Sequence, residues 1–219
     1  SGFYHNIPIA HIEAGLRTYN KKSPFPEEMN RQITTRLADY RFAPTEESKK
    51  NLINENINDN NIFVTGNTVI DSLVSSIKKV KNNPSSKIKN LSGDLKNHEV
   101  VLVTFHRREN YGNGFIKICE ALKEIALKSP DKIIVFPVHL NPNVQKPVNN
   151  ILSNIKNIIL LKPLSYEDFI WIMNRSKLII TDSGGIQEEA PSLGKPVLVL
   201  RDTTERPEAV KAGTVLLVG

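Results

Sequence analysis

The sequence predicts an α/β protein built on parallel sheets. Short β-branched runs alternate with helical patterns along the chain, and this alternation is typical of strand–helix–strand crossovers. From residue 100 onward the alternation is regular. The strands predicted there are 100–105, 133–138, 158–161, 178–181, 197–200 and 215–218, and the helices between them are 114–127, 143–152, 166–174, 186–193 and 205–211. Six strands with five crossovers make a complete doubly wound, Rossmann-like domain.

The first part of the chain carries fewer strand signals. Strands are predicted over 7–12, 41–43 and 62–65, and helices over 26–37 and 69–80. Met29, Ile33 and Leu37 recur at helical spacing on one face of the first helix. Thr45 is a suitable N-cap for a further helix. About three strands are fewer than a free-standing doubly wound domain contains, so we expect residues 1–80 to be the C-terminal part of an incomplete first domain.

The segment 81–98 is rich in Asn, Ser, Lys and Pro and shows no hydrophobic periodicity. Such a composition is typical of a linker. The predicted organisation is therefore a partial Rossmann-like domain over 1–80, a linker over 81–98 and a complete domain over 99–219.

Composition excludes several functional classes. The net charge is +6, but the lysines are scattered and do not alternate with aromatic residues, so we expect an anionic small ligand and no nucleic acid. No apolar run approaches the roughly 20 residues of a membrane span. The first residues lack the features of a signal peptide. The single cysteine, Cys119, rules out a disulfide framework, and we expect a cytoplasmic protein without a membrane partner.

The stretch Ser183-Gly184-Gly185 follows a predicted strand and precedes a predicted helix. Backbone N–H groups at a helix start, with its positive dipole end, are suited to phosphate oxygens. A phosphorylated or nucleotide ligand is the first hypothesis. The alternative is that the glycine pair only turns the chain.

Charged and imidazole groups follow several of the predicted strands. Glu13 follows 7–12, a run beginning with His106 follows 100–105, and His139 follows 133–138. Ligands of such folds bind outside the carboxyl ends of the strands, so these groups are expected to form one site. Each has a structural alternative: a hydrogen-bonded histidine, a surface ion pair of Arg107 with Glu109, or glutamates at 27 and 28 that favour the helix dipole.

Seven motifs occur in one order and carry a resemblance to a known family. They are His11-Ile12-Glu13-Ala14-Gly15-Leu16-Arg17-Thr18, Pro24-Phe25-Pro26-Glu27-Glu28-Met29-Asn30-Arg31, Thr65-Gly66-Asn67-Thr68, His106-Arg107-Arg108-Glu109-Asn110, Val138-His139-Leu140-Asn141-Pro142, Thr181-Asp182-Ser183-Gly184-Gly185-Ile186-Gln187-Glu188-Glu189 and Arg201-Asp202-Thr203-Thr204-Glu205-Arg206-Pro207-Glu208. Over nearly its whole length the chain closely resembles the non-hydrolysing UDP-N-acetylglucosamine 2-epimerases.

The resemblance implies two Rossmann-like domains of the GT-B type that face each other across a cleft, and usually a homodimer. It implies that UDP leaves UDP-N-acetylglucosamine by anti elimination across C1 and C2, which forms 2-acetamidoglucal. UDP then adds back after protonation from the other face, giving UDP-N-acetylmannosamine for cell-envelope polysaccharide. This chemistry requires a base and an acid near C2 and donors that hold the diphosphate. No cofactor and no metal are expected.

Site residues carry over from the family by motif. Glu13 and Glu27 resemble the catalytic carboxylates, and His106 resembles the group near the leaving bond. The implied substrate contacts are Ser183, Gly184 and Gly185 to the diphosphate, Glu189 to the ribose, Arg206, and the backbone of Phe169 to the uracil. The implied contacts to a second, allosteric UDP-N-acetylglucosamine are Glu28, Arg107 and His139.

The chain also departs from the family pattern. An N-terminal half-domain with a basic segment and a catalytic Gly-Asp motif has no counterpart here, and a C-terminal helix is missing after Gly219. Leu164 stands where some relatives have a polar residue near the uracil. We therefore expect little or no epimerase activity from these 219 residues alone. The alternatives are a GT-B nucleotide-sugar glycosyltransferase and a non-catalytic UDP-sugar-binding fragment.

Overall fold

The computed structural model describes residues 2–107 and 112–219. The chain forms two compact units, which we describe separately. Unit 1 comprises Ser1–Asp71 and Thr203–Lys211, and unit 2 comprises Ser72–Asp202 and Ala212–Gly219. These limits differ from the predicted limits at 80 and 99. One reason is that the segment Thr203–Lys211 bonds to unit 1: Thr45 Oγ1 donates to Glu208 Oε1 over 2.5 Å.

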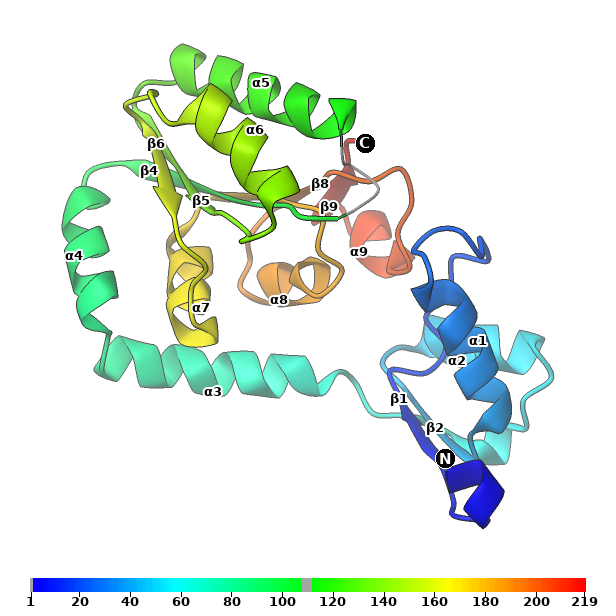
Figure 1. Ribbon diagram of the computed structural model, residues 1–219. Coiled ribbons are helices and arrows are strands. Elements are labelled where there is room, and N and C mark those ends of the chain that lie inside the picture. The colour runs from blue at the N-terminus through cyan, green and yellow to red at the C-terminus, as the bar shows by residue number, and fades with distance from the viewer. Residues whose placement is uncertain (1, 108–111) are drawn as a thin grey trace. The chain divides into compact units, whose positions relative to one another are not determined.

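Unit 2 contains a six-stranded parallel sheet (Figure 1). Its strands are β4 (Glu99–Thr104), β5 (Lys132–Pro137), β6 (Ile158–Leu161), β7 (Leu178–Thr181), β8 (Val197–Val199) and β9 (Val215–Leu217). Their order is β6-β5-β4-β7-β8-β9, which is the doubly wound order of a Rossmann-like domain. All five pairings are parallel. The predicted fold class and the six predicted strands are confirmed.

Helices cover both faces of this sheet. The helices α5 (Asn113–Lys128) and α6 (Pro142–Leu152) lie on one face, and α7 (Tyr166–Arg175) and α8 (Ile186–Ser192) lie on the other (Figure 1). On α5 the buried residues Phe115, Cys119, Leu122 and Ala126 recur at helical spacing and pack against the strands. Among the helices of the described residues, none combines the length and the hydropathy of a membrane span.

The segment predicted as a linker, 81–98, contains the helix α4 (Ser86–Asp94) directly after α3 (Thr68–Asn82). The Ser85 hydroxyl caps α4 by accepting from the Ile88 N–H. Ile88, Leu91 and Leu95 are buried. The polar composition of the segment hides this short apolar stripe, so the expectation of an aperiodic linker was wrong for its local structure.

Unit 1 contains a three-stranded parallel sheet in the order β1-β2-β3. Its elements are η1 (Gly2–His5), β1 (Ala10–Ile12), α1 (Glu27–Leu37), β2 (Tyr40–Ala43), α2 (Glu46–Asn54), η2 (Asp59–Asn61), β3 (Ile62–Val64) and, from the returning segment, α9 (Pro207–Lys211). The predicted cap is confirmed, because the Thr45 side chain accepts from the Ser48 N–H at the start of α2. Three strands agree with the expected incomplete first domain.

The predicted apolar face of α1 is present, but it is not the buried face. Met29, Ile33 and Leu37 are between 42% and 52% exposed, whereas the buried residues of α1 are Glu28 and Thr35. Within unit 1, the buried side of α1 is therefore held by hydrogen bonds of Glu28 and Thr35.

Candidate functional site

The sheet of unit 2 has a topological switch point between β4 and β7. The strands β5 and β6, which come next after β4, lie on one side of this point. The strands β8 and β9, which come after β7, lie on the other side. The crossovers leave this point in opposite directions, and the resulting crevice outside the strand ends is where doubly wound proteins bind ligands. His106 follows β4 at this point, and Ser183 follows β7.

Asp182 joins the two sides of the switch point. Its carboxylate is fully buried, and Oδ2 accepts hydrogen bonds from the N–H groups of His106 at 2.9 Å and Arg107 at 2.7 Å. His106 Nδ1 lies 3.8 Å from Asp182 Oδ1, and the ring of His106 stacks on that of His139 with centroids 5.2 Å apart. The imidazole of His106 stays exposed. The buried carboxylate thus positions the exposed His106, whose ring stacks on the exposed His139 at the next strand end.

The loop after β7 presents unused backbone donors. The Ser183 N–H donates to Thr181 Oγ1 at 3.0 Å. The N–H groups of Gly184 and Gly185 donate to no acceptor among the described residues. No heavy atom lies within 4 Å of a Cβ built on Gly185, so the space beside it is open. A ligand can therefore approach this backbone closely.

A second polar pair lies on α7 and α8. The hydroxyl of Tyr166 donates to Glu189 Oε1 over 2.6 Å. Burial raises the pKa of the Glu189 carboxyl, and the Tyr166 hydrogen bond opposes that rise. Burial and the neighbouring Glu189 carboxylate raise the pKa of Tyr166 as well, so the phenol remains the donor. Phe169 is half-buried one turn after Tyr166.

Glu13 is exposed and sits in a strained backbone conformation in unit 1. Its φ of 58° lies in the left-handed region, which costs a non-glycine residue about 1 kcal/mol or more. The Asn67 amide donates to Glu13 Oε1 at 3.1 Å and orients the carboxylate. Strain of this kind occurs disproportionately at functional sites.

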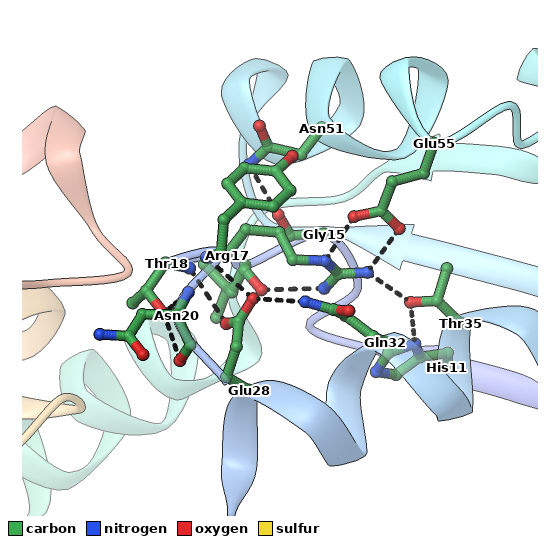
Figure 2. A network of polar contacts seen from close by, with 12 residues as sticks. His11, Gly15, Arg17, Thr18, Asn20, Glu28, Gln32, Thr35, Asn51 and Glu55 are labelled. Atoms are coloured by element: carbon green, nitrogen blue, oxygen red, sulfur yellow. Dashed lines mark hydrogen bonds and ion pairs between the residues drawn. The ribbon is translucent and has the colours of Figure 1, made fainter. Parts of the chain in front are cut away.

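A buried polar network follows Glu13 in the chain (Figure 2). The side chain of Arg17 is fully buried, and its guanidinium donates to both oxygens of Glu55, to the carbonyl of Leu16 and to the hydroxyl of Thr35. Thr35 Oγ1 lies 3.3 Å from His11 Nδ1. Burial, then Arg17 and two other arginines, lower the pKa of His11 to about 4, so this ring is neutral at pH 7.

Glu27 and Glu28 are adjacent but have opposite environments. Glu27 is exposed as the first residue of α1, and its carboxylate bonds to none of the described residues. Glu28 is fully buried: it accepts from the N–H groups of Thr18 and Tyr19, both at 3.0 Å, and from the Gln32 amide at 2.9 Å (Figure 2). The sequence suggested Glu28 as a contact to a regulatory ligand. That contact stays a prediction; in the structure the Glu28 carboxylate holds the backbone of the loop before α1.

Arg206 lies in the segment that returns to unit 1. It is 7% exposed, and Nη1 donates to Glu205 Oε1 at 2.7 Å. Glu205 in turn lies 3.5 Å from Arg31 Nη2 on α1. The predicted substrate contact is therefore part of a charged cluster within unit 1.

The predicted site residues fall into three groups. Those gathered at the switch point of unit 2 are His106, Arg107, His139, Ser183, Gly184 and Gly185, those on α7 and α8 are Phe169 and Glu189, and those in unit 1 are Glu13, Glu27, Glu28 and Arg206. Arg108, Glu109 and Asn110 lie outside the described residues. Within residues 2–107 and 112–219, no group of three or more His, Cys, Asp or Glu side chains is arranged to hold a metal ion.

Three polar residues of these groups were missed as site residues. Asp182 and Asn67 belong to motifs quoted above, and each follows a predicted strand within two residues, which is a usable sequence signal. No sequence signal pointed to Tyr166, because it bonds to a residue 23 positions away.

The fold and the switch-point groups define a doubly wound, Rossmann-like α/β protein with a candidate ligand site at the β4–β7 switch point. The chain belongs to the UDP-N-acetylglucosamine 2-epimerase family, whose model matches residues 1–219. A UDP-N-acetylglucosamine 2-epimerase of Campylobacter jejuni is 61% identical to it, covering 100% of this chain and 59% of the relative. Family membership predicted from the motifs is thus confirmed.

Solved structures agree in fold. A crystal structure of UDP-GlcNAc 2-epimerase from Neisseria meningitidis bound to UDP-GlcNAc matches with a TM-score of 0.94 and 54% identity over 100% of this chain and 59% of that one. The Methanocaldococcus jannaschii enzyme in complex with UDP-GlcNAc and UDP matches with a TM-score of 0.86 and 37% identity, over 100% and 60%. These matches confirm the GT-B type of fold. The chain spans 59% of the length of the curated relatives it matches.

Proposed function

We propose that this chain carries the UDP-holding and proton-transfer groups of a reversible, non-hydrolysing UDP-N-acetylglucosamine 2-epimerase. A base removes the proton from C2, the C1–oxygen bond breaks, and UDP leaves with the bonding electrons, so that 2-acetamidoglucal forms. An acid then protonates C2 from the opposite face while UDP adds back to C1, giving UDP-N-acetylmannosamine. The proposed partners are UDP-N-acetylglucosamine and UDP, in a homodimer.

One observation carries the nucleotide part of the proposal: donors converge at the β4–β7 switch point. The N–H groups of Gly184 and Gly185, which bond to no acceptor among the described residues, and the exposed His106 lie on the two sides that Asp182 joins. Donors held in place before the reaction stabilise the charge that develops on a leaving diphosphate. In this proposal the Ser183–Gly185 loop and His106 hold the diphosphate, Glu189 accepts from the ribose, the Phe169 backbone contacts the uracil, and Arg206 contacts the substrate.

The proton transfers are assigned to Glu13 and Glu27. Both carboxylates are exposed, and Glu13 is oriented by Asn67. Two carboxylates that serve opposite faces of C2 account for inversion at that carbon. Among the allosteric candidates, Arg107 and His139 lie with His106 at the switch point, whereas Glu28 is buried.

Deuterium exchange tests the reaction. In deuterated water, an enzyme of the relatives' length that contains this chain is expected to place deuterium at C2 of both UDP-sugars, as followed by proton NMR. Glu13→Gln and Glu27→Gln are each expected to slow this exchange about 10²-fold to 10⁴-fold, because each removes one proton-transfer group. Glu46→Gln, an exposed glutamate on α2, is the matched control. Absence of exchange in the unmodified enzyme would refute the epimerase proposal.

UDP binding tests the switch-point site in the 219-residue chain. Calorimetry is expected to show UDP binding, and Ser183→Trp is expected to weaken it at least about tenfold, since the indole would fill the space beside the open N–H groups. Ser153→Trp, at an exposed position after α6, should leave binding unchanged. Equal binding by the Ser183 variant would place UDP elsewhere.

The two alternatives predict different outcomes. UDP release that depends on an added acceptor would favour a GT-B glycosyltransferase. UDP binding by the chain, with no C2 exchange in the longer enzyme, would favour a sugar-nucleotide-binding fragment.

A further inference from the structure

We propose that Tyr166 is a specificity-determining residue of the nucleotide site, because its hydroxyl positions the Glu189 carboxylate for the ribose hydroxyls. This inference rests on the proposed function, in which Glu189 is the ribose acceptor. It adds a residue that does not itself need to contact the ligand.

The contact is short and well anchored. The Tyr166 hydroxyl lies 2.6 Å from Glu189 Oε1, the length of a hydrogen bond to a charged acceptor. Tyr166 is the first residue of α7, and the Ser165 side chain caps that helix by accepting from the Asp168 N–H. Glu189 lies on α8 and is 6% exposed. The bond therefore links the starts of two helices that follow β6 and β7.

The bond leaves one carboxylate oxygen for a ligand. Oε1 is occupied by Tyr166, whereas Oε2 accepts from no donor among the described residues. Holding one oxygen fixes the plane of the carboxylate and hence the direction of the other. A buried carboxylate without this donor would rotate or take up a proton, and a protonated acid accepts more weakly from a hydroxyl.

Tyr166 also connects this acceptor to the proposed base contact. Tyr166 is 43% exposed, and Phe169, three residues on, shares its side of α7. One helix start thus carries both the group that orients the ribose acceptor and the backbone assigned to the uracil.

Ribose discrimination in the 219-residue chain tests the inference. The quantity is the ratio of the Kd for 2′,3′-dideoxyuridine diphosphate to the Kd for UDP, from NMR titrations of the unmodified chain, Tyr166→Phe, Glu189→Gln and the double variant. Tyr166→Phe is expected to weaken UDP binding about fivefold to tenfold and to lower the ratio toward that of Glu189→Gln. In the Glu189→Gln background, Tyr166→Phe should cause no further change.

Tyr40→Phe is the matched control, because Tyr40 is 46% exposed and lies on β2 of unit 1. Loss of structure alone would weaken the binding of both ligands equally and leave the ratio of the two Kd values unchanged. An unchanged ratio in Tyr166→Phe, with a reduced ratio in Glu189→Gln, would overturn this inference and leave the proposed function intact. No UDP binding by the unmodified chain would overturn both the inference and the proposed switch-point UDP site. An unchanged ratio in Glu189→Gln would overturn both the inference and the ribose role proposed for Glu189.

Discussion

Gly15→Ala is expected to unfold unit 1, with a loss of at least about 4 kcal/mol of stability. Gly15 has a φ of +89°, and a Cβ built on it would lie 2.1 Å from the carbonyl oxygen of Ser48 on α2. The obstructing atom is backbone within a helix, so it cannot rotate away as a side chain would. The substitution therefore has to displace α2 or the turn that carries Glu13.

Gly66→Ala separates the steric effect from the backbone effect. Gly66 has a φ of +74° but no heavy atom within 4 Å of the added Cβ, so only the left-handed conformation is penalised, by about 1 kcal/mol. Native-state hydrogen exchange of the β2 amides reports the stability of unit 1 in both variants. Equal losses in the two variants would contradict the close-approach explanation.

Arg17→Met is expected to destabilise unit 1 by about 3–5 kcal/mol. The guanidinium is fully buried and serves the Glu55 carboxylate, the Leu16 carbonyl and the Thr35 hydroxyl (Figure 2). Methionine retains much of the volume but leaves these groups without their donor. Leaving a carboxylate without its buried partner costs more than the ion pair itself contributes.

A double-mutant cycle with Glu55→Met tests this reasoning. The variant with both substitutions is expected to be more stable than Arg17→Met alone, because it no longer leaves a carboxylate unpaired. The same exchange measurement at β2 applies. Additive losses would show that Arg17 acts through packing and through its other two acceptors.

Residues of the His11–Thr18 motif have different roles. Glu13 is exposed with a strained backbone, whereas Gly15 and Arg17 are buried and hold the turn in place. The motif joins one candidate catalytic group to the residues that maintain its position. A family motif therefore does not by itself show which of its residues touch a ligand.

Much of the fold was predictable because its signals are local. The six strands of unit 2 are β-branched runs, and the structure places them within one or two residues of the predicted ranges. The helix α4 was missed because a cap at Ser85 and three apolar residues lie within a polar segment. From the sequence, the segment that carries Arg206 was predicted to belong to the second domain. The structure assigns it to unit 1, because it bonds there to a residue far away in sequence.

In the candidate site, too, features with a local sequence signal were predicted and contacts between distant residues were not. The Ser183–Gly185 loop was recognisable because strand, glycine pair and helix are contiguous. The bond from Asp182 to the His106 N–H joins residues 76 positions apart, and that from Tyr166 to Glu189 joins residues 23 positions apart. No short motif encodes such pairs.

The sequence by itself determined the α/β class, the order of the strands along the chain and the family, because hydrophobic periodicity and motif order are properties of a linear pattern. Only the tertiary structure decided that Glu28 is buried while Glu27 is exposed, and that Tyr166 holds Glu189. The physical reason is that burial and hydrogen bonding depend on neighbours supplied by other elements.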